Sequence, residues 1–129
     1  MGSRQEIVAR ARACVGARFR AHGRDPAWGL DCVGVVARAF AIAVPADYPL
    51  RGGTAGLVGR FAAAAGLRPL APNEAGPGDL VLVGAGPGQL HLAVLTPGGF
   101  VHADAGLRRV VETPGAPGPL LGAWQGGEN

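Results

Sequence analysis

The sequence of 129 residues contains no lysine and only two cysteines, and aromatic residues make up 5% of it. Because aromatic side chains bury the most surface per residue, a core with so few must be built mainly from Ala, Val and Leu. No apolar run approaches the roughly 18 residues that a membrane-spanning helix needs, so we expect no membrane partner. The N-terminus lacks a hydrophobic stretch with a small-residue cleavage site, which predicts cytoplasmic synthesis without a signal peptide. Free thiols are then expected at Cys14 and Cys32.

The net charge is +3, and every basic residue that contributes to it is an arginine. A mild positive balance favours acidic partners such as an anionic cell-wall polymer. The arginines are scattered along the sequence and are not interleaved with aromatics, so no nucleic-acid partner is expected. The candidates to meet acidic groups of a substrate are Arg18, Arg20 and Arg24.

Hydrophobic periodicity divides the chain into a helical first half and a strand-rich second half. Helices are predicted over residues 3–15, 32–42 and 54–65, with a loop at 17–29 that contains an extended piece at 18–20. A proline-rich connector at 68–78 leads to strands at 79–83, 90–95, 99–103 and 108–113, with an edge strand at 120–124. Short Gly/Pro turns between the strands favour an antiparallel meander. At this length the chain is predicted to form a single domain, residues 1–129, of the α+β class.

The residues that carry candidate chemistry begin with Asp31 and Cys32, directly before an apolar helical run. Asp31 is a good helix N-cap, which places Cys32 in the first turn of the helix. The free N–H groups and the helix dipole stabilise a thiolate there, so Cys32 is a candidate nucleophile. The alternative is a plain buried cysteine, and Cys14 is expected to be one.

Two histidines of the second half, His91 and His102, lie on consecutive predicted strands joined by a tight turn. They can therefore approach each other, one as the base for a thiol and the other as the group that orients it. A zinc site formed by Cys32, His91 and His102 is the alternative, although close ligand pairs are missing. Neither alternative is decided by the spacing.

Taken together, the segments Asp31-Cys32-Val33-Gly34, Gly78-Asp79-Leu80-Val81, His91-Leu92-Ala93-Val94 and Phe100-Val101-His102-Ala103 resemble the NlpC superfamily of cell-wall cysteine peptidases. The resemblance implies a papain-like domain in which N-terminal helices pack on an antiparallel β-sheet. It also implies Cys32 as nucleophile, His91 as general base and acid, and His102 as the orienting residue. The family typically cleaves the peptidoglycan stem peptide between D-γ-glutamate and a diamino acid, without metal or cofactor.

The resemblance extends to substrate contacts in the loop before the nucleophile, where Asp31, Phe19 and His22 are the candidates. The chain has Phe19 where the family commonly has tyrosine, and Val33 where it commonly has serine, so a substrate or oxyanion contact is altered. The compact domain without a leader resembles the branch found in phage tails and gene transfer agents, which implies tail proteins as partners. Two alternatives remain, namely a same-fold amidase or acyltransferase and a structural tail component with a decayed site.

Overall fold

The computed structural model describes residues 1–44, 55–86 and 89–128, and its core is one six-stranded antiparallel sheet. The sheet has the order β3-β8-β4-β5-β6-β7. Its strands are β3 (Arg68–Leu70), β4 (Leu80–Gly86), β5 (Gln89–Thr96), β6 (Gly99–Asp104), β7 (Arg109–Pro114) and β8 (Leu120–Gln125). A two-stranded sheet of β1 (Arg24–Asp25) and β2 (Gly29–Leu30) precedes it in the chain. The other elements are α1 (Arg4–Ala13), α2 (Cys32–Phe40), α3 (Ala55–Ala64) and a 3-10 turn, η1 (Pro72–Glu74).

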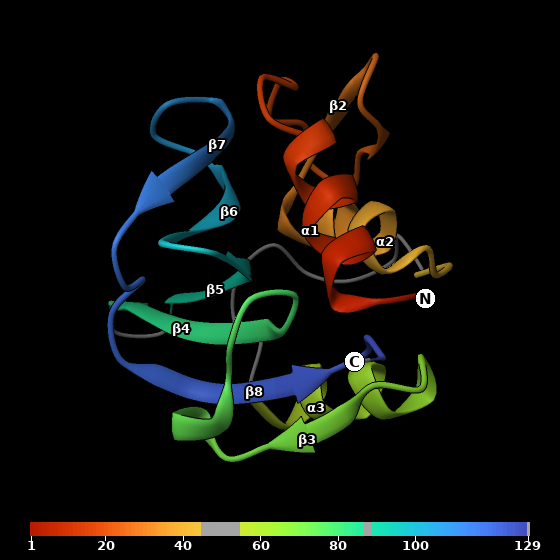
Figure 1. Cartoon of the computed structure of the whole chain (residues 1–129). Helices are drawn as coiled ribbons and strands as arrows, with labels where there is room; N and C mark the ends of the chain where they lie inside the picture. The colour runs from red at the N-terminus through yellow and green to blue at the C-terminus, as the bar shows by residue number, and fades with distance from the viewer. Residues whose placement is uncertain (45–54, 87–88, 129) are drawn as a thin grey trace.

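The two N-terminal helices pack against one face of this sheet and form the main core with it (Figure 1). Ile7 and Phe40 from the helices pack into the same cluster as Leu82, Val94 and Val110 from the strands. Alternate strand residues point to the other face, where a smaller cluster contains Val81, Val83, Ala93, Phe100 and Ala123. The predicted α+β class and the packing of helices on an antiparallel sheet are confirmed.

Helix α1 begins as its sequence predicts, because Ser3 and Glu6 form a reciprocal capping box. It ends at Ala13, two residues before the predicted end. Val15, which lies within the predicted helix, is therefore 44% exposed, and Cys14 takes the inward position with 2% exposure. The predicted helix was too long at this end, and a buried helical stripe continues only as far as the helix does.

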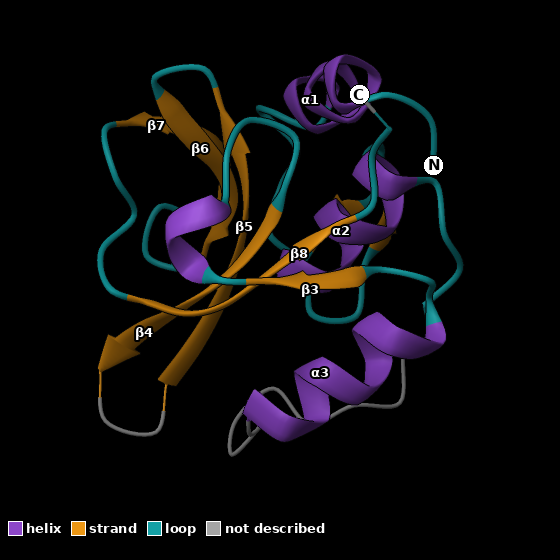
Figure 2. Ribbon diagram, turned by 60° about the horizontal axis from the view of Figure 1, so that its bottom comes forward, coloured by secondary structure: helices purple, strands orange, loops and turns teal. Residues whose placement is uncertain are grey.

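The sheet edge differs from the prediction in one respect. Strand β8 pairs with β4 on one side and with β3 on the other, so it is an interior strand (Figure 2). The true edge is β3, which lies in the segment predicted as a connector. The sequence pattern did not predict this strand because Pro69 argues against one. Proline is nevertheless tolerated on an edge strand, since a backbone N–H on the outer side has no partner to donate to.

The meander β4-β5-β6-β7 is confirmed, and α3 contacts β3 and β8 at the β3 edge of the sheet (Figure 2). Residues 45–54, which include the first residue of the helix predicted over 54–65, lie outside the described residues. Within the described part of the chain, no helix is long and apolar enough to cross a membrane.

Candidate active site

Helix α2 begins at Cys32 and is capped by Asp31, as the sequence predicts. The Asp31 carboxylate is 2% exposed and accepts a hydrogen bond from the backbone N–H of Gly34 at 2.8 Å. It also accepts from the backbone N–H of His22 at 2.8 Å and from Arg24 Nη1 at 3.2 Å. Asp31 therefore fastens the preceding loop to the start of the helix, and its carboxylate is engaged inside the protein. A substrate contact by Asp31, which the sequence suggested, stays a prediction.

The first turn of α2 also needs a glycine at position 34. A Cβ atom there would lie 2.1 Å from the carbonyl oxygen of Gly23, so the loop backbone packs directly against the helix. Only glycine allows two backbones to approach this closely. Gly34 and Gly23 together hold the loop across the helix N-terminus, beside the Cys32 thiol.

The loop that packs on the N-terminus of α2 also contains Phe19 and His22. Phe19 is half-buried against the main core, and its segment bridges to Leu30, so the extended piece predicted at 18–20 is confirmed. His22 adopts a positive φ of 60° and donates its backbone N–H to Asp31. Both residues shape the loop that leads to Cys32, and a substrate contact by either stays a prediction.

Strands β5 and β6 separate next to this helix N-terminus. Their ladder consists of the pairs Thr96–Gly99, Leu95–Phe100 and Val94–Val101, and it ends there. The rest of both strands is unpaired and forms an open fork, where the backbone N–H of Leu92 lowers the pKa of the Cys32 thiol. Cys32 packs against the main core on the helix side, so the fork is the place where the thiol meets the sheet.

The two histidines lie on these diverging strands and are in direct contact. His91 Nε2 and His102 Nδ1 are 2.7 Å apart and share a hydrogen bond, with the rings edge to face. The other nitrogen of His102, Nε2, is 3.0 Å from the hydroxyl oxygen of Thr113 on β7. The structure thus brings the predicted histidine pair together and extends it by one residue that sequence reasoning missed. Nothing in the local pattern around Thr113 marks it, because its role depends on the register of β6 and β7.

Burial lowers the pKa of His91, and the neighbouring His102 lowers it further. Burial also lowers the pKa of His102. Asp104 opposes both effects, since its negative charge raises the pKa of each imidazole. Asp104 stands two residues beyond His102 on the same strand, hence on the same face of the sheet. Both imidazoles are therefore held neutral near pH 7, the state in which one nitrogen of His91 is free to accept a proton.

The Cys32 thiol differs from the thiolate expected at a helix N-terminus. Burial and then the charge of Asp31 raise its pKa to about 11, and the backbone N–H groups of Leu92, Val33 and Cys32 lower it only in part. The helix N-terminus does act in the predicted direction, but desolvation is the larger effect. In the described residues no hydrogen bond joins the sulfur to His91, and no three ligating side chains form a metal-binding cluster.

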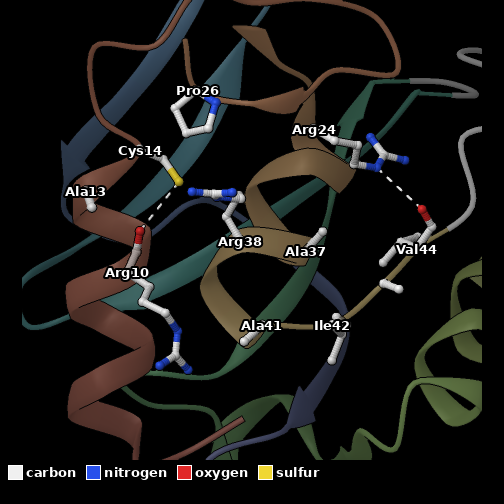
Figure 3. Close-up of a pocket in the computed structure, with 11 residues that line it drawn as sticks. Arg10, Ala13, Cys14, Arg24, Pro26, Ala37, Arg38, Ala41, Ile42 and Val44 are labelled. Atoms are coloured by element: carbon white, nitrogen blue, oxygen red, sulfur yellow. Dashed lines mark hydrogen bonds between the residues drawn. The ribbon is translucent and has the colours of Figure 1, made fainter. Parts of the chain in front are cut away.

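A separate cavity of about 720 Å³ lies between α1 and the far end of α2, at the opposite end of that helix from Cys32. Figure 3 shows Cys14 at its wall, where the thiol donates to the carbonyl oxygen of Arg10 at 3.4 Å. Burial raises the pKa of Cys14, so its expected role as a plain buried cysteine agrees with its surroundings. Both cysteines are free thiols.

Comparison with solved structures identifies the fold. The chain superimposes on the NlpC/p60 domain of the peptidoglycan hydrolase SagA with a TM-score of 0.66 and 22% identity, covering 95% of this chain and 98% of that one. The P60 domain of an antigen from Mycobacterium avium subspecies paratuberculosis gives 0.67 and 20%, with 98% and 96% covered. The peptidoglycan hydrolase RipB from Mycobacterium tuberculosis gives 0.64 and 25%, with 98% of this chain and 65% of that one covered. No protein-family model matches the sequence, and no curated protein sequence matches it significantly. The chain has the papain-like fold of NlpC/p60 domains.

Proposed function

We propose that this protein is a cysteine peptidase that hydrolyses peptidoglycan, with Cys32 as the nucleophile. The observation that supports the proposal most is the hydrogen-bonded series His91–His102–Thr113 at the fork where the N-terminus of α2 presents Cys32. Peptidoglycan hydrolases with the same fold support the substrate class. The sequence segments around Cys32, His91 and His102 agree with the NlpC superfamily.

The hydrogen bonds restrict which protons the two histidines carry when the site is ready to react. His91 Nδ1 must be unprotonated to accept the thiol proton, so the ring proton lies on Nε2 and is donated to His102 Nδ1. His102 then carries its proton on Nε2 and donates it to the hydroxyl oxygen of Thr113. Thr113 thereby accepts a hydrogen bond from the tautomer of His102 that this arrangement requires, and His102 accepts one from the required tautomer of His91.

The same geometry supports the following reaction steps. Because the thiol pKa is about 11, Cys32 is protonated before the substrate binds. His91 takes the proton as the sulfur attacks the carbonyl carbon, and the backbone N–H of Cys32 donates to the oxygen that becomes negative. His91 then gives the proton to the leaving amine, which leaves a thioester on Cys32. Water, deprotonated by His91, attacks the thioester, and the proton returns to the sulfur as the acid product departs.

The resemblance also supports a specific bond, that between D-γ-glutamate and the diamino acid of the stem peptide. The partner proposed with it is the tail of a phage or gene transfer agent, on which the domain would reach the cell wall. Purified particles tested with an antibody against the chain check this partner, because a tail component copurifies with particles through a density gradient.

A second candidate is a structural protein in which the catalytic site has decayed. The raised pKa of Cys32 and the missing hydrogen bond between its sulfur and His91 favour it. The same-fold amidase or acyltransferase is the remaining alternative, which shares the nucleophile and differs in the acceptor.

Digestion of purified diamino-acid-type peptidoglycan tests these proposals. We expect the wild type to release stem fragments that end in D-glutamate, identified by mass spectrometry. The Cys32→Ala variant should release none, while Cys14→Ala, which removes the other thiol, should remain active. If neither the wild type nor Cys14→Ala releases fragments, the hydrolase proposal is wrong and the structural alternative is favoured.

A further inference from the structure

An extended segment crosses the surface next to the candidate active site. Arg18 forms an antiparallel bridge with Arg109 at the start of β7, and the backbone N–H of Phe19 donates to the carbonyl oxygen of Arg108 at 3.0 Å. On its other edge, the segment accepts a hydrogen bond from Leu30, whose N–H lies 2.8 Å from the carbonyl oxygen of Arg18. The segment therefore acts as a strand between β7 and β2.

The arginines of this segment point outward together. Phe19 packs against the core, so its neighbours Arg18 and Arg20 project to the solvent side. Arg109 is exposed and precedes the fully buried Val110. Because bridge partners project to the same side, Arg18, Arg20 and Arg109 share one face. With the exposed Arg108 beside them, these four residues form what we call the arginine surface.

The arginine surface forms no ion pair within the described part of the chain. Some other arginines are paired, as Arg12 is with Glu112 and Arg24 with Asp31. None of the four guanidinium groups has a hydrogen bond or ion pair in residues 1–44, 55–86 and 89–128. Asp104 lies opposite Arg109 in the register of β6 and β7, but its carboxylate accepts from the backbone N–H of Leu107.

Two like charges directly opposite each other on neighbouring strands repel, and Arg18 and Arg109 are such a pair. An anion bound from outside removes this repulsion. Guanidinium groups suit carboxylates in particular, because they donate two parallel hydrogen bonds to both oxygens.

The location of the arginine surface indicates which kind of anion binds to it. Leu30, which bonds to this segment, is two residues from Cys32, and Asp104, opposite Arg109, is two residues from His102. The arginine surface therefore lies next to the candidate active site, within reach of a polymer that extends beyond that site. We infer that the arginine surface binds the carboxylates of peptidoglycan stem peptides next to the one being cut. The inference rests on the proposed substrate and adds the residues that hold the polymer.

Co-sedimentation with purified peptidoglycan sacculi tests this inference in the Cys32→Ala background, where no cleavage occurs. One variant adds Arg18→Gln, Arg20→Gln and Arg109→Gln. The matched control adds Arg38→Gln, Arg60→Gln and Arg68→Gln, which removes the same charge from exposed positions elsewhere. We expect the apparent Kd to rise about tenfold for the first variant and to change less than about twofold for the control. Sacculi whose carboxylates have been amidated should bind weakly to every variant.

Equal weakening in both triple variants would show a general charge effect and overturn the inference. The inference would also be overturned if the surface variant lost binding to a DNA duplex while its binding to sacculi stayed unchanged. That result would assign the arginine surface to nucleic acid. With Cys32 intact, the three surface substitutions should reduce cleavage of whole sacculi more than hydrolysis of a short soluble stem peptide. If the wild type cleaves nothing while sacculus binding still depends on these arginines, the hydrolase proposal fails and the arginine surface stands. If the wild type cleaves peptidoglycan and the apparent Kd for sacculi does not depend on these arginines, only the inference about the arginine surface is wrong.

Discussion

Replacing Asp31 by asparagine should make the Cys32 thiol more acidic. The carboxylate of Asp31 is the second cause, after burial, of the raised pKa of about 11. A charge in close range shifts a pKa by about one unit or more, so we expect the pKa of Cys32 to fall by about one unit in Asp31→Asn. At pH 8 the thiolate population then rises about tenfold. A less basic thiolate is also a weaker nucleophile, which reduces the net gain in alkylation rate to about threefold.

The substitution keeps most of the local structure. The amide oxygen of Asn at position 31 can take the place of the Asp31 Oδ1 atom and still accept hydrogen bonds from Gly34 and Arg24. The amide nitrogen replaces Oδ2 and faces the backbone N–H of His22, so that hydrogen bond is lost. The free energy of unfolding should decrease by about 1–3 kcal/mol, and the alkylation must be measured well below the melting temperature.

Iodoacetamide alkylation, followed over pH by mass spectrometry of tryptic peptides, measures this shift. Cys14 and Cys32 fall in different peptides because arginines separate them, so Cys14 serves as an internal reference. Asp25→Asn is the matched control, since Asp25 is exposed and its carboxylate accepts from the backbone N–H of Ala27. The reasoning is refuted if the alkylation midpoint of Cys32 stays unchanged or rises in Asp31→Asn while the protein remains folded.

Three further predictions follow from the fork and the loop. Thr113→Val removes the acceptor of His102 Nε2 and should lower kcat about tenfold with KM unchanged. Thr113→Ser keeps the hydroxyl and should retain the wild-type kcat. As a control, Thr96→Val loses a hydroxyl bonded to Glu112 and should not lower kcat. Gly34→Ala places a Cβ 2.1 Å from the Gly23 oxygen and should cost about 3 kcal/mol in urea unfolding, whereas Gly59→Ala, with open space at its Cβ, should stabilise α3. The lowered pKa values of His91 and His102 mean that the unfolded chain binds more protons below about pH 6.5, so the free energy of unfolding should be smaller at pH 5.5 than at pH 7.5. His102→Asn should reduce this difference, and an unchanged difference would contradict the assignment.

Local pattern was sufficient for most elements. The capping box of α1, the Asp31 cap of α2 and the meander of β4 to β7 each depend on residues within a few positions of one another. The pairing of β8 with β3 was not predictable in this way, since it joins residues more than fifty positions apart and one strand contains Pro69. The contact of His91 with His102 could be predicted because a tight turn joins their strands.

The candidate site was predictable only where it depends on residues that are close in sequence or on strands joined by a tight turn. Thr113 takes its role from the register of β6 with β7, and the arginine surface is assembled from two segments about ninety positions apart. The sequence showed scattered arginines because clustering of this kind exists only after folding. Arg24, which it suggested as a substrate contact, forms an ion pair with Asp31 in the folded chain, a contact between loop and helix cap that the pattern did not predict.

The fork between β5 and β6 reconciles two observations that conflict in a fully paired sheet. His91 and His102 follow the strand alternation of Ala93 and Phe100, which places them on the face away from the helices, whereas Cys32 packs on the helix side. A continuous ladder would put the strand backbones between the thiol and the imidazoles. Because pairing ends at Val94 and Val101, the helix N-terminus reaches the opening, where the backbone N–H of Leu92 lowers the pKa of the thiol. The catalysis proposed for Cys32 therefore requires the strands to part at this position, so the end of the ladder belongs to the candidate site together with the side chains beyond it.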